Sequence, residues 1–186
     1  MAKEKKYSVA RQILSILASH LSICFATGFL TIVFLGVSEH KTIKIILSIV
    51  CAFIYVTWMI SAAYAQATSD NRPYTPLKPH PAKGLLLSVG TATLVGIIWI
   101  LYILVWKYMP MTDTFKAPTL IVMILYIYVT SPFSLIMNIS GPTANLWGQI
   151  ASVAVPIIAC TFGYYSGYKK WDLSKYTKII MFEKKK

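Results

Sequence analysis

The sequence predicts an all-α fold, a bundle of helices embedded in a lipid bilayer. Hydrophobic residues make up 56% of the 186 positions, and only 13% are charged, about half the ~25% usual for soluble domains. Apolar stretches of the roughly 20 residues that a helix needs to cross a bilayer recur along the chain. The charges collect at the two ends and between these stretches. Together these features indicate a membrane protein.

The expected elements divide the chain into a basic N-terminal tail (residues 1–10), a transmembrane domain (11–168) and a basic C-terminal tail (169–186). A connector with four prolines separates the first two spans from the rest, because proline lacks the N–H that a helix interior needs. The expected spans are residues 11–37, 42–67, 84–106 and 147–168, and a further apolar segment covers 119–139.

Charge placement decides how many of the five apolar segments cross the membrane. Basic residues collect on the cytoplasmic side of membrane proteins. If the segment 119–139 does not cross, fourteen of the eighteen Lys and Arg residues share one side with both termini. Pro132 weakens that segment as a helix. We therefore expect four transmembrane helices, one re-entrant or interfacial apolar segment, and both termini in the cytoplasm at the cell membrane. Five crossings are the alternative.

Three short patches resemble uncharacterised small bacterial polytopic membrane proteins. They are Ser69-Asp70-Asn71-Arg72 leading into Lys83-Gly84-Leu85, the turn Thr130-Ser131-Pro132-Phe133, and the Gly-Tyr-Lys exit from the last span before a Lys-rich tail. The resemblance implies no activity, cofactor or catalytic residue.

One polar stripe lies within the first span. His20 is the only ionisable residue deep in a span, and the stripe repeats at helical spacing through His20, Cys24, Thr27 and Thr31. Such a stripe either lines a path for a solute or forms hydrogen bonds across a seam between helices. The polar residues Asn138, Asn145 and Gln149 around the break at Gly141-Pro142 are a second candidate lining, or a polar surface turn.

Small residues recur at a spacing of four, which allows helices to approach closely. The predicted helix-packing positions are Ser88, Ala92 and Gly96 in the third span and Ala159, Gly163 and Gly167 in the last. Ser15, Ala18, Ser19, Ser22 and Ala26 form a similar face on the first span. The sequence leaves open whether each partner helix belongs to this chain or to another.

The C-terminal tail predicts an amphipathic helix on anionic lipid, or else a solvated tail. Its lipid-facing lysines are Lys169, Lys170, Lys175, Lys178, Lys184, Lys185 and Lys186. The partners expected are therefore the bilayer, anionic lipid headgroups, and either a second copy or another membrane protein. Nucleic acid is not expected, because the basic residues border apolar spans.

The residues offer no catalytic, cofactor or metal site, so we expect no enzyme. All six acidic residues lie outside the interiors of the expected spans, and the three histidines are scattered. The first hypothesis is a structural or accessory subunit that packs with itself or with a membrane partner. The alternative is a small channel or facilitator for an uncharged or weakly polar solute.

Overall fold

The computed structural model describes residues 8–37, 41–73, 75, 77–108, 116–138 and 146–171. This part of the chain is all helical apart from its turns and connectors. The two expected tails lie mainly outside it, at residues 1–7 and 172–186. The helices are α1 (Val9–Val37), α2 (Lys41–Asp70), α3 (Lys83–Tyr108), α4 (Lys116–Asn138) and α5 (Leu146–Tyr168).

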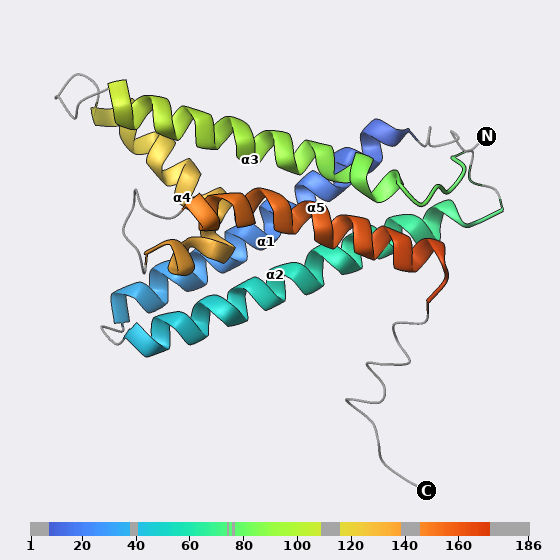
Figure 1. The fold of residues 1–186 in the computed structure, drawn as a ribbon, viewed down its shortest axis with the longest axis horizontal. Coiled ribbons are helices and arrows are strands. Elements are labelled where there is room, and N and C mark those ends of the chain that lie inside the picture. The colour runs from blue at the N-terminus through green and yellow to red at the C-terminus, as the bar shows by residue number, and fades with distance from the viewer. Residues whose placement is uncertain are drawn as a thin grey trace, which may run out of the picture.

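Helices α1, α2, α3 and α5 run along the long axis of the molecule, whereas α4 stays at one end (Figure 1). Helices α1 and α3 run in one direction, and α2 and α5 return in the other. One end of the bundle therefore gathers the start of α1, the end of α2, the start of α3 and the end of α5. We call it the Asp70 end, after the last residue of α2.

The expected fold class is confirmed: four helices are long and apolar enough to cross a membrane, and one apolar helix is shorter. The candidate spans are Val9–Leu30, Ile45–Asp70, Lys83–Val105 and Gln149–Tyr168, of 20 to 26 residues. At 1.5 Å per residue, 20 residues reach ~30 Å. The described side chains of α4 form a shorter apolar stretch, Ala117–Phe133, within a helix of 23 residues. The described residues therefore support four helices of spanning length.

Helix α4 continues through Pro132, although the sequence analysis expects the proline to weaken the helix there. The helix runs on to Asn138 with Pro132 inside it. Residues 129–133 are all buried, and the ring of Phe133 packs edge-on against Tyr55 of α2, with 5.4 Å between ring centroids. Packing on every side therefore maintains a helix that Pro132 alone would weaken.

Helices α2 and α5 pack so closely that glycine is required between them. A Cβ atom at Gly163 would overlap the carbonyl oxygen of Ile60 and come within 2.8 Å of its Cα. At Gly167 a Cβ would lie 2.7 Å from that of Ala67. By contrast, a Cβ at Gly96 on α3 would meet no atom within 4 Å.

The glycines give a matched test of this packing. Gly163→Ala is expected to destabilise the bundle by about 1–3 kcal/mol, because the backbone of α2 must move to accommodate the methyl group. Gly96→Ala should leave stability unchanged or raise it by up to about 1 kcal/mol, since alanine is the better helix former. Unfolding in mixed detergent micelles, followed by circular dichroism, measures both. Equal changes in the two variants would contradict the close approach of α2 and α5.

Candidate functional site

The Asp70 end contains a buried ion pair. Asp70 is the last residue of α2 and only 2% exposed, and Lys83 is the first residue of α3 and 7% exposed. The Lys83 Nζ lies 2.6 Å from the Asp70 Oδ2. A charge withdrawn from water is costly unless it is paired and hydrogen-bonded, so this contact fixes the end of one span against the start of the next.

Two further helices bind the same carboxylate. The hydroxyl of Tyr164 on α5 donates to Oδ2 at 2.6 Å, and Nε2 of Gln12 on α1 donates to Oδ1 at 2.6 Å. All four spanning helices therefore meet at Asp70. We call Asp70, Lys83, Tyr164 and Gln12 the Asp70 cluster.

Asp70 lies beyond the expected span 42–67 but belongs to helix α2, so the expected end of that span is wrong. Helix α2 extends three residues beyond the expected end at position 67, and its last turn turns the carboxylate inward. The neighbouring Asn71 donates from Nδ2 to the carbonyl oxygen of Gly167, at 3.0 Å, near the end of α5. The patch Ser69-Asp70-Asn71-Arg72 is visible in the sequence, but its residues do not indicate which side chains contact Asp70.

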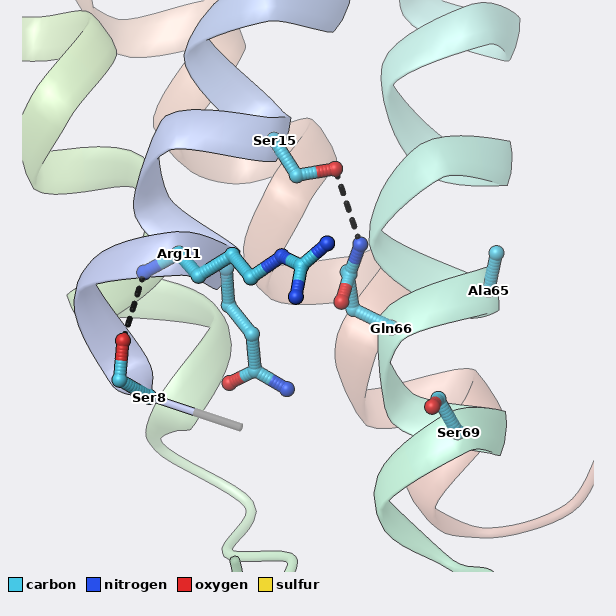
Figure 2. Close-up of a pocket in the computed structure, with 7 residues that line it drawn as sticks. Ser8, Arg11, Ser15, Ala65, Gln66 and Ser69 are labelled. Carbon is cyan, nitrogen blue, oxygen red and sulfur yellow. Dashed lines mark hydrogen bonds between the residues drawn. The ribbon is translucent and has the colours of Figure 1, made fainter. Parts of the chain in front are cut away.

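A cavity of about 280 Å³ lies beside the cluster, between the first turns of α1 and the last turns of α2. Figure 2 shows the Arg11 side chain reaching across it towards Gln66. Gln66 donates from Nε2 to the hydroxyl oxygen of Ser15, at 3.1 Å. The lining is polar except at one position: Ser8, Arg11, Gln12, Ser15, Ala65, Gln66 and Ser69.

The predicted polar stripe on α1 lies inside the bundle. His20 is 1% exposed, and its Nδ1 shares a hydrogen bond of 2.8 Å with the hydroxyl of Tyr55 on α2. Cys24 lies against the imidazole, with its Sγ 3.7 Å from Nε2, and its thiol donates to the carbonyl oxygen of Val129 on α4. The side chain of Thr31 lies outside the described residues.

The lower part of the stripe fixes α4 against α1. The hydroxyls of Thr27 and Ser131 share a hydrogen bond of 3.0 Å, and Ser131 Oγ donates to the carbonyl oxygen of Cys24 at 2.8 Å. The Tyr128 hydroxyl donates to the carbonyl oxygen of Leu21. These hydrogen bonds join α1 to α4. They agree with the interpretation of the stripe as a seam between helices and not as the lining of a path for a solute.

The predicted helix-packing residues and the polar residues near the Gly141-Pro142 break differ in burial and contacts. Ala159, Gly163 and Gly167 on α5 are buried, as is Ser88 on α3, whereas Ala92 and Gly96 are half-buried. Gln149 donates to the Tyr126 hydroxyl at 3.4 Å. Asn145 and the side chain of Asn138 lie outside the described residues.

Of the predicted lipid-facing lysines, the structure describes Lys169 and Lys170, and both are exposed. The Lys169 Nζ lies 5.9 Å from the ring centroids of Tyr165 and of Tyr168. Lys175, Lys178 and Lys184 to Lys186 lie outside the described residues, so the amphipathic tail helix stays a prediction. Within the described ranges, no three His, Cys, Asp or Glu residues gather into a group that could hold a metal ion.

The Asp70–Lys83 pair predicts strong coupling. Asp70→Asn or Lys83→Met should each cost about 3–5 kcal/mol of unfolding free energy, because either change leaves its partner charged and buried. The double variant should recover part of this loss, and Lys78→Met, which removes an exposed lysine of the connector, should change little. Chemical unfolding of the four variants in micelles measures the coupling. Strictly additive effects would show that the pair does not clamp the helices.

No protein-family model, curated protein or solved structure matches this chain. The resemblance to small bacterial membrane proteins therefore stays a prediction. Because that resemblance implied no activity, the function has to follow from the geometry of the bundle itself.

Proposed function

We propose that this membrane protein is a structural or accessory subunit that packs, through the outer face of α1, against a helix of a second copy or of another membrane protein. The observation that carries the proposal is an unoccupied small-residue stripe. Ala18, Ser22 and Ala26 follow one another at a spacing of four, and all three are exposed. Small side chains in this pattern allow two helices to approach closely within a membrane.

The contrast with α5 supports this assignment. On α5 the same spacing runs through Ala159, Gly163 and Gly167, which are all buried, and α2 of the same chain lies against the two glycines. On α1 the stripe is flanked by Phe25 and Phe29, which are 65% and 64% exposed. A partner helix placed there would approach the small residues closely and would also contact these two apolar rings.

The alternative, a facilitator for an uncharged or weakly polar solute, rests on the polar stripe through His20. Its described members bond to Tyr55, Val129 and Ser131 within the bundle. These bonds favour a structural seam, because polar groups that line a path must be available to the solute. Solute flux into liposomes that is lost in His20→Ala would favour the alternative.

We further propose that the Asp70 end faces the cytoplasm and that the chain catalyses no reaction. Arg11, Arg72, Lys83 and Lys169 are described at this end, and positive charge is retained on the cytoplasmic side. The absence of catalysis rests on the residue inventory of the sequence.

The association surface has a matched test. Ser22→Leu is expected to weaken self-association or partner capture by about tenfold or more, because leucine keeps the helices apart. Thr57→Leu on α2 is the control. Both residues are exposed and both hydroxyls donate to their own helix, at 2.9 Å, to the carbonyl oxygens of Ala18 and Phe53.

Cross-linking in native membranes and sedimentation in detergent measure the association. A wild-type protein that is strictly monomeric, with no co-purifying membrane protein, would overturn the proposal. So would equal losses in the two leucine variants.

The orientation is tested by cysteine accessibility. A background without Cys24, Cys51 and Cys160 is needed, since the chain holds these three buried cysteines. Lys78→Cys, exposed in the connector of the Asp70 end, should react with a membrane-impermeant maleimide only after the cells are opened. Labelling in intact cells would reverse the proposed orientation.

A further inference from the structure

The chain turns back sharply where α5 ends. Lys170 has a φ of 55°, the left-handed conformation in which helices commonly end. Its N–H donates to the carbonyl oxygen of Gly167 at 3.1 Å. The next N–H, that of Trp171, donates to the carbonyl oxygen of Ser166 at 3.0 Å. Asn71, just after α2, also donates to the Gly167 carbonyl oxygen, so groups from both helices hold this turn.

The turn places Trp171 on the outer face of α5. The Trp171 ring packs edge-on against the rings of Tyr165 and Phe162, with 5.9 and 6.3 Å between ring centroids. Phe162 lies six residues before the end of α5, which is about 9 Å back along the helix. The Trp171 carbonyl oxygen accepts a hydrogen bond from the hydroxyl of Tyr64 on α2, at 2.9 Å. The chain therefore leaves α5 sideways, over an exposed face, and not straight on along the helix axis.

This exit lies at the level expected for lipid headgroups. The candidate span ends at Tyr168, and Trp171 follows it with 46% of its surface exposed. The Lys169 Nζ lies 5.9 Å from the ring centroids of Tyr165 and Tyr168. Tryptophan and tyrosine collect at the boundary between a membrane and water, so the chain that follows Trp171 begins at the membrane surface.

The sequence beyond Trp171 has the composition of a segment that binds an anionic bilayer. From position 169 to the end, the chain has seven lysines and two acidic residues. Leu173, Tyr176 and Ile180 recur among them at helical spacing. Lysine clusters beside a span are attracted to anionic headgroups, and an apolar stripe can lie among the adjoining acyl chains.

We propose that the turn at Lys170 and the packing of Trp171 direct residues 172–186 onto the bilayer surface at the Asp70 end, where their lysines bind the phosphates of anionic lipids. A solvated tail, the other prediction from the sequence, has no need of a turn that leads the chain sideways. The proposal is independent of the association surface on α1, because the turn involves only α5 and the end of α2.

The test measures the depth of the tail in full-length protein in lipid nanodiscs. A nitroxide is attached at Thr177→Cys in a background without the three native cysteines, and its collisions with a nickel chelate dissolved in the water are measured. We expect collisions about threefold or more fewer in phosphatidylglycerol mixed with phosphatidylcholine than in phosphatidylcholine alone.

Lys170 offers a matched pair of variants that separates the turn from the charge. Lys170→Gly and Lys170→Pro both remove the ammonium group, but only glycine can keep a φ of 55°, since proline is fixed near −65°. In the mixed nanodiscs Lys170→Gly should stay within about 1.5-fold of the wild type, because one lysine of seven is lost. Lys170→Pro should raise the collisions about threefold, to the level of phosphatidylcholine alone. Trp171→Ala should have the same effect as Lys170→Pro.

Two results would overturn the proposal. Equal collision rates in the two lipid compositions would show that the tail does not recognise anionic headgroups. Equal rates in the Lys170→Gly and Lys170→Pro variants would show that the turn does not direct the tail.

Discussion

The bundle depends on the neutralisation of one carboxylate. Asp70 is removed from water at the end of α2, and such a charge is stable only with a counter-charge and with its remaining oxygen positions bonded. Lys83 supplies the counter-charge, and Tyr164 and Gln12 supply two further donors. Because these groups belong to α1, α3 and α5, the position of each spanning helix along the bundle axis is set at one point.

This clamp fixes one end of the bundle and places polar groups beside it. The amide nitrogen of Gln12 donates a hydrogen bond to Asp70. The amide oxygen is buried and accepts no hydrogen bond from a described residue. Lys83 pairs with the only described carboxylate, so none of the described residues offers Arg11 a second one. The polar cavity between α1 and α2 thus lies beside the point at which the four helices are joined.

The spans could be predicted from the sequence because crossing a bilayer requires a length and an apolar composition, both of which are local properties. Charge placement then separated α4 from the other helices. The Asp70 cluster could not be predicted, because Gln12, Lys83 and Tyr164 lie 58, 13 and 94 residues away from Asp70. Hydropathy alone assigns an acidic residue near the end of a span to the adjoining loop and not to the helix. The continuation of α4 through Pro132 was missed for a similar reason, since the packing around it is not local.

The small-residue pattern shows how far spacing alone can determine a role. Gly163 on α5 and Ser22 on α1 belong to stripes with the same period of four, and the sequence treats them alike. In the structure Gly163 lies against the Ile60 backbone, whereas Ser22 is exposed. Close helix approach is weakly driven in lipid, because apolar side chains gain little by leaving acyl chains. A stripe therefore contributes stability only where a helix covers it, and an uncovered one on α1 argues for a partner that brings its own helix.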